Sequence, residues 1–102
     1  MHRAAGLIGL LGAVLAVGCG TTDRAESSAG QGLFAQDCSV CHSLSGRQSP
    51  QRQGGDLLML HVGREAMLQF VEEMPVRHRL SPAQLRAVAG YVLAVERSGR
   101  PG

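Results

Sequence analysis

The sequence contains no lysine: all of its ten basic residues are arginines, set against eight acidic residues. These charges form no basic patch, so the sequence offers no support for nucleic-acid binding. It also lacks the run of about 20 apolar residues that a membrane-spanning helix requires. Neither an internal repeat nor a second domain is present in the 102 residues, which therefore predict one small domain.

The N-terminal residues have the pattern of a bacterial export signal. A short charged start precedes an apolar run over residues 7–17, which is too short to be a stable membrane span. The run leads into Leu15-Ala16-Val17-Gly18-Cys19, which resembles a lipobox, although Ala16 stands where leucine is usual. We expect residues 1–18 to be removed and Cys19 to become a lipidated N-terminus on the periplasmic side of a bacterial membrane. An ordinary signal cut nearby is the alternative.

Residues 38–42 read Cys38-Ser39-Val40-Cys41-His42, the C-x-x-C-H pattern of covalent haem attachment. The thiols of Cys38 and Cys41 can each form a thioether bond to one haem c, and His42 then lies under the iron as an axial ligand. The chain has three cysteines, and none is left over if Cys19 carries lipid. No disulfide is then needed.

The rest of the chain divides by composition. Residues 19–29 are mostly small and polar and predict a flexible tether. Residues 30–97 carry the apolar positions of a folded all-α domain, and residues 98–102 predict a disordered tail. This domain has a thin core for its size, and a covalent haem would supply the missing apolar surface. We therefore expect the haem-free chain to be largely unfolded.

Three helices are expected. The first begins near Gly30 and enters the attachment motif, and the second spans residues 64–73, ending before Pro75. The last begins after Ser81, which forms a capping box with Gln84, and stops at Ser98-Gly99. Residues 43–62 are a looser stretch that we expect to wrap the edge of the haem.

Met74 is the predicted second axial ligand. Pro75 ends the preceding helix where a side chain must turn toward the iron, and a thioether opposite an imidazole raises the reduction potential. The alternative ligands are Met59, His61, Met67 and His78. His61 would give a bis-histidine site with a lower potential.

At these positions the sequence resembles the class I cytochromes c, small monohaem electron carriers. The resemblance is carried by Gly30-x-x-Leu33-Phe34-x-x-x-Cys38-x-x-Cys41-His42, by Met74-Pro75 and by Leu80-Ser81-Pro82-x-Gln84-Leu85. It implies a compact cytochrome c fold of about three helices around one haem, bound by Cys38, Cys41, His42 and Met74. It also implies that Gly30 and Phe34 meet the last helix around Val88 and Tyr91. The chain departs from the family at Gly55, where a proline is common, and in the short spacing between His42 and Met74.

The function expected from these features is one-electron transfer by a monomeric, membrane-tethered carrier that is not an enzyme. It would exchange electrons with redox protein partners. A first alternative is a fixed haem subunit of a larger oxidoreductase complex. A second is a haem enzyme or gas sensor with an open distal site, which would require that Met74 not bind the iron.

Overall fold

The computed structural model describes residues 20–47 and 53–102 of the chain. The predicted export signal over residues 1–18 and the predicted lipidation site at Cys19 lie outside the described residues. These described residues are mostly helical and form three α-helices, as expected for an all-α domain. Their elements are α1 (Gly20–Leu33), a short π-helix η1 (Phe34–Cys38), β1 (His42–Ser43), β2 (Gly55–Asp56), α2 (Arg64–Glu73) and α3 (Pro82–Ser98).

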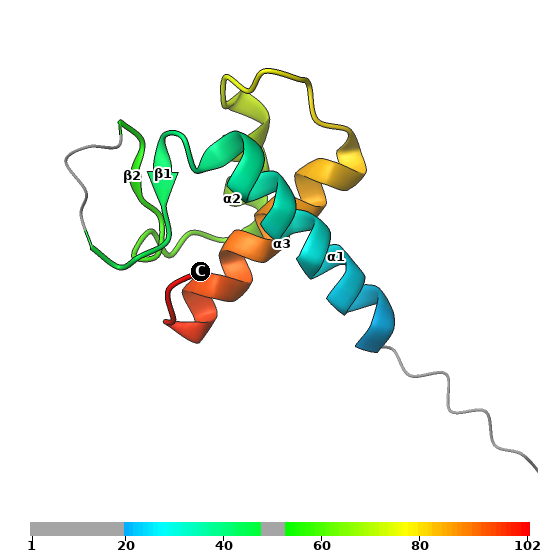
Figure 1. Cartoon of the computed structure of the whole chain (residues 1–102), viewed down its shortest axis with the longest axis horizontal. Coiled ribbons are helices and arrows are strands. Elements are labelled where there is room, and N and C mark those ends of the chain that lie inside the picture. The colour runs from blue at the N-terminus through cyan, green and yellow to red at the C-terminus, as the bar shows by residue number, and fades with distance from the viewer. Residues whose placement is uncertain (1–19, 48–52) are drawn as a thin grey trace, which may run out of the picture.

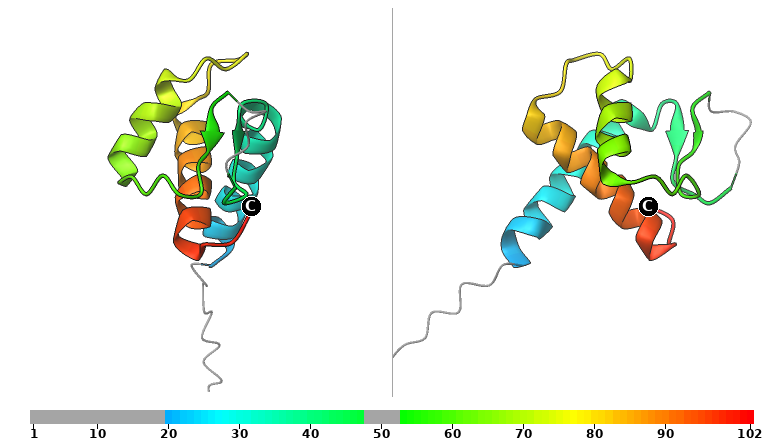
Figure 2. Two further views of the ribbon diagram at one scale, coloured as in Figure 1. Left: turned by 90° about the vertical axis from the view of Figure 1, so that its left-hand side faces the viewer. Right: turned by 180° about the vertical axis from the view of Figure 1, so that it is seen from behind.

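Helix α3 lies between α1 and α2 and packs against both (Figures 1 and 2). Its predicted start is confirmed, because the Ser81 hydroxyl accepts from the Gln84 N–H and the Gln84 side chain accepts from the Ser81 N–H. Its predicted stop is also confirmed, since Gly99 adopts a left-handed conformation with φ 62°. Helix α3 is thereby fixed at both ends and forms the centre of the core.

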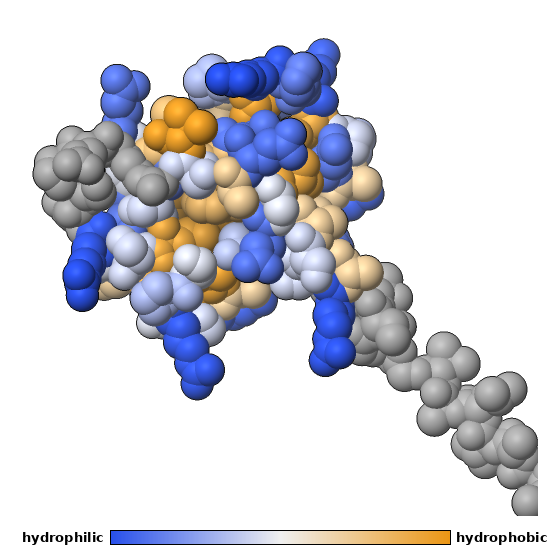
Figure 3. Space-filling model, in the orientation of Figure 1, coloured by the Kyte–Doolittle hydropathy of each residue, from blue (hydrophilic) through white to orange (hydrophobic). Residues whose placement is uncertain are grey.

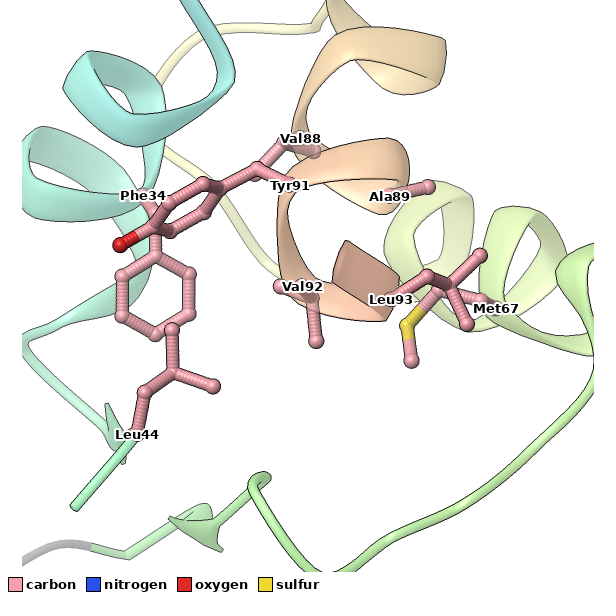
Figure 4. Close-up of a cluster of buried hydrophobic side chains, with 8 residues drawn as sticks. All are labelled: Phe34, Leu44, Met67, Val88, Ala89, Tyr91, Val92 and Leu93. Carbon is pink, nitrogen blue, oxygen red and sulfur yellow. The ribbon is translucent and has the colours of Figure 1, made fainter. Parts of the chain in front are cut away.

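The predicted crossing of the first and last helices is confirmed. Gly30 lies so close to α3 that a Cβ there would overlap the Ala87 carbonyl and come within 2.8 Å of the Tyr91 Cβ. One turn later, the rings of Phe34 and Tyr91 are 5.9 Å apart and tilted by 55°. The glycine therefore allows the close approach, and the two aromatic rings fill its flank (Figure 4).

The expectation of a flexible tether over residues 19–29 is not met in residues 20–29, which form the first part of α1. This part contains no proline, and its residues from 24 to 29 are exposed on all sides. It therefore shows no apolar period by which a helix could be recognised. Adding residues to a helical turn that is already formed costs little free energy. The helix that is packed at Gly30 can therefore extend toward the N-terminus.

Helix α2 spans the predicted residues 64–73. Met74 follows it with an extended backbone at φ −70° and ψ 139°, as expected for a residue before proline. Among the described residues, no helix is both long enough and apolar enough to cross a membrane.

Two short strands and the C-terminal residues close the other end of the core. Strands β1 and β2 pair in parallel, with His42 opposite Gly55. The tail over 98–102, expected to be disordered, lies against the core: Ser98 ends α3, and the Gly102 N–H donates to the Leu44 carbonyl at 3.0 Å. The buried Leu44 holds this tail against Tyr91. Outside these contacts, apolar side chains reach the surface in patches between polar ones (Figure 3).

Candidate functional site

An almost wholly apolar cavity of about 280 Å³ lies where η1, β1, α2 and α3 meet. The residues that line it are Phe34, Cys38, His42, Leu57, Leu60, Met67, Phe70, Val71, Met74, Val76, Val88 and Val92. Figure 4 shows Val92 pointing from α3 into the space between Phe34 and Met67. Leu60, Phe70 and Met74 are partly exposed, so the cavity opens to solvent on their side.

His42 is held in this wall by the backbone at Gly54, the residue before β2. A Cβ at Gly54 would overlap the imidazole ring, with 2.7 Å to its Nε2 atom. The Gly54 N–H donates to the Cys41 carbonyl at 2.7 Å, which fixes the two segments against each other. Glycine at position 54 therefore lets the main chain form a flat support for the histidine ring.

Gly55 has a backbone conformation that excludes proline. Its φ is +72°, which glycine adopts readily and which proline, with φ near −65°, cannot adopt. The segment that supports His42 therefore follows a path that a proline at position 55 could not take.

The two cysteines of the attachment motif differ in their surroundings. Cys38 ends η1, is half-buried and lines the cavity, whereas Cys41 is exposed and lies outside the lining. Burial, reinforced by the neighbouring Asp37 carboxylate, raises the pKa of the Cys38 thiol. Cys38 is therefore kept as a neutral thiol, which suits an apolar wall.

Of the five candidates for the second axial ligand, two line the cavity. Met74 is 42% exposed at its mouth, while Met67 is 2% exposed and belongs to the buried core. Met59 is 68% exposed and His78 is also exposed, and neither lines the cavity. His61 lines a different cavity, between α2 and the end of α3. The structure thus brings Cys38, His42 and Met74 together and leaves His61 apart.

Asp56 organises the segment that follows His42. Its Oδ2 atom accepts from the Ser43 hydroxyl at 2.6 Å, and from the Ser45 N–H and hydroxyl at 2.7 and 2.8 Å. Its Oδ1 atom accepts from the N–H groups of Gly46 at 3.1 Å and Leu58 at 3.0 Å. Burial acts to raise the pKa of Asp56, but these hydrogen bonds together bring it well below its ordinary value.

The site residues that sequence reasoning missed are Asp56 and the supporting role of Gly54. Most of the residues on which they act lie ten or more positions earlier in the chain, and no local pattern in the sequence signals such a partner. Within residues 20–47 and 53–102, no three His, Cys, Asp or Glu side chains are grouped to hold a metal ion. An imidazole and a thioether on one apolar cavity, beside a cysteine, do fit the ligand set of a haem.

No family model, no curated protein and no solved structure shows significant similarity to this chain.

Proposed function

We propose that this protein is an exported, lipid-anchored carrier of single electrons with the compact fold of the class I cytochromes c. One haem c, attached through Cys38 and Cys41, would supply reversible one-electron Fe(III)/Fe(II) chemistry. The proposal includes removal of residues 1–18, lipidation of Cys19 and encounters with redox protein partners at the periplasmic side of the membrane.

The observation that carries the proposal is the shared apolar cavity. Cys38, His42 and Met74 come from three separate segments, were predicted as haem contacts from the sequence, and line one cavity. The Gly54 backbone orients the imidazole, and the extended backbone at Met74 turns the chain out of α2 beside Pro75. The apolar lining would limit the water around a bound haem and, with a thioether ligand, would favour the reduced state.

The proposal is tested by the optical spectrum of the haem-loaded ferric protein. We expect a long-wavelength iron–methionine band in the wild type, its loss in Met74→Ala, and its retention in the matched control Met59→Ala. Met59 is the suitable control because its side chain lies outside the cavity. A wild-type spectrum that is high-spin and accepts external ligands would refute His42/Met74 ligation and support an enzyme or sensor with an open iron.

A second candidate function, a fixed haem subunit of a larger complex, is favoured by the exposed apolar side chains near the cavity. Val40 is 73% exposed, and Met59 and Leu60 are exposed in the loop that follows β2. Exposed apolar side chains that gather into one contiguous patch are typical of a lasting protein interface. Extraction from membranes in mild detergent, followed by size-exclusion chromatography, distinguishes the two: a carrier elutes alone, and a subunit elutes with fixed partners.

A further inference from the structure

Glu96 is a buried acid near the end of α3. It is 5% exposed and is the one buried charged residue in the part of the chain that the structure describes. It lies four residues after Val92, which lines the haem cavity, and eight after Val88, which also lines it. Residues at this spacing share one helix face, so Glu96 extends the cavity-lining stripe by one turn, about 6 Å further along the axis.

The carboxylate is only partly satisfied. The backbone N–H of His61 donates to it, whereas its Oε1 atom is buried and has no hydrogen-bond donor among the described residues. A buried, charged acceptor without a donor is costly, and a bound proton removes that cost. His61 reaches this position with φ 47°, a left-handed backbone that is uncommon outside glycine and is found at functional sites.

A second cavity, of about 370 Å³, lies beside Glu96. The titratable and charged groups that line it with Glu96 are His61 of the preceding loop, Arg64 at the start of α2 and Arg97 of α3. Burial raises the pKa of Glu96, and the charge and the N–H of His61 oppose that rise. The cavity gives the carboxyl group a route to solvent protons.

The loop over residues 57–63 separates the two cavities. Leu57 and Leu60 line the proposed haem cavity, and His61 to Gly63 line the one beside Glu96. The buried carboxyl group is therefore close to the proposed redox centre but does not contact its ligands. A change in charge at the iron would act on Glu96 through this loop and the apolar residues of the cavity wall, where electrostatic effects are stronger than in water.

We propose that Glu96 takes up a proton when the haem is reduced and releases it when the haem is oxidised. This inference rests on the proposed function. A one-electron donor protein delivers the electron to the iron, and a proton from solvent forms an O–H bond at the Glu96 carboxylate. Both leave on oxidation, so charge is balanced in each direction. By linkage, reduction favours protonation of Glu96 as much as protonation favours reduction.

The test is the midpoint potential of the haem-loaded protein as a function of pH. We expect the potential to fall as pH rises through the titration of Glu96, by up to about 59 mV for each tenfold change in proton activity. Glu96→Gln is expected to abolish this slope. Glu65→Gln, which changes an exposed carboxylate on α2, is the matched control and is expected to keep it.

A second variant keeps the test informative if Glu96→Gln fails to fold. Asparagine at position 61 tolerates the left-handed backbone and keeps the N–H that donates to Glu96. His61→Asn therefore removes only the imidazole, whose charge opposes protonation of Glu96. We expect its slope to persist and to move to higher pH. Infrared difference spectra should also show a protonated carboxyl band on reduction of the wild type that Glu96→Gln lacks.

A haem protein whose potential is independent of pH would overturn this proposal and leave the proposed function intact. An unchanged slope in Glu96→Gln would also overturn it, because the titrating group would then be one other than Glu96. A chain that carries no haem would overturn both proposals.

Discussion

Replacement of Asp56 tests how the structure holds the segment after His42. Among the described residues, its carboxylate accepts five hydrogen bonds, from the hydroxyls of Ser43 and Ser45 and from the N–H groups of Ser45, Gly46 and Leu58. Asparagine has nearly the same shape but replaces one acceptor oxygen by an NH₂ donor. The N–H groups around the carboxylate cannot accept from that donor, whereas the Ser43 and Ser45 hydroxyls can turn to accept from it, so Asp56→Asn should lose part of the stability that Asp56→Ala loses.

The size of the loss follows from which of these bonds water can replace. Three of the five are exposed, and solvent can take over the role of the carboxylate there. The bonds from the Ser43 hydroxyl and the Leu58 N–H are partly buried. At about 1 kcal/mol each, these two bonds predict that Asp56→Ala lowers the free energy of unfolding by about 2 kcal/mol at neutral pH.

The loss should depend on pH in a defined direction. The pKa of Asp56 is lower in the folded protein than in the unfolded chain, because its hydrogen bonds outweigh the effect of burial. The stabilisation is therefore fully present above the ordinary aspartate pKa of about 3.9 and is lost as pH falls below it. The difference in free energy of unfolding between wild type and Asp56→Asn should become smaller below about pH 4.

Guanidinium denaturation of the purified protein, followed by circular dichroism at pH 7 and pH 3, measures both effects. Ser45→Ala removes only an exposed hydroxyl bond and should cost less than Asp56→Asn. Glu72→Gln, at an exposed position on α2, is the control and should change little. The reasoning is refuted if Asp56→Asn is as stable as wild type at pH 7, or if the difference is the same at both pH values.

Three further predictions concern close contacts and the cavity. Gly30→Ala should lower the free energy of unfolding by about 1–3 kcal/mol, because the added Cβ overlaps α3. Gly32→Ala has open space around it and should raise the free energy of unfolding by up to about 1 kcal/mol. Thermal unfolding measures both changes. Gly54→Ala should displace the His42 ring and alter the haem spectrum, while Gly90→Ala should leave that spectrum unchanged. Haem-free protein should show no cooperative thermal transition, because an empty cavity of about 280 Å³ costs up to about 7 kcal/mol, comparable to the whole stability of a small domain.

Local signals in the sequence were sufficient for the second and third helices. The bounds of α2 and the capping box of α3 depend on residues within a few positions of each helix end, so Pro75, Ser81 and Gln84 could be interpreted without the fold. The chemistry of C-x-x-C-H is equally local. Whether this motif shares a site with Met74 depends on the fold, and in the structure Cys38, His42 and Met74 line one cavity.

The remaining features depend on contacts that sequence spacing does not encode. The tail at Gly102 is ordered by a hydrogen bond to Leu44, and the segment after His42 by the carboxylate of Asp56. At the end of the π-helix η1, the Ser39 N–H donates to the Phe34 carbonyl at 2.8 Å. No feature of the amino-acid composition signals this local geometry. The tail and the segment after His42 each required a distant partner segment to be in place.

The helical form of residues 20–29 has a consequence for how the proposed lipid anchor would present the domain. A flexible chain of this length spans about 17 Å on average, and a helix spans about 15 Å, so the mean height above the membrane is nearly the same. The spread about that mean differs, because a flexible chain samples all heights and orientations, whereas a helix continuous with the crossing at Gly30 turns with the domain as one body. If Cys19 carries lipid, α1 acts as a strut that limits the directions in which the cavity mouth can face. Partners would then be selected by the height and angle of their own electron-transfer sites as well as by surface chemistry.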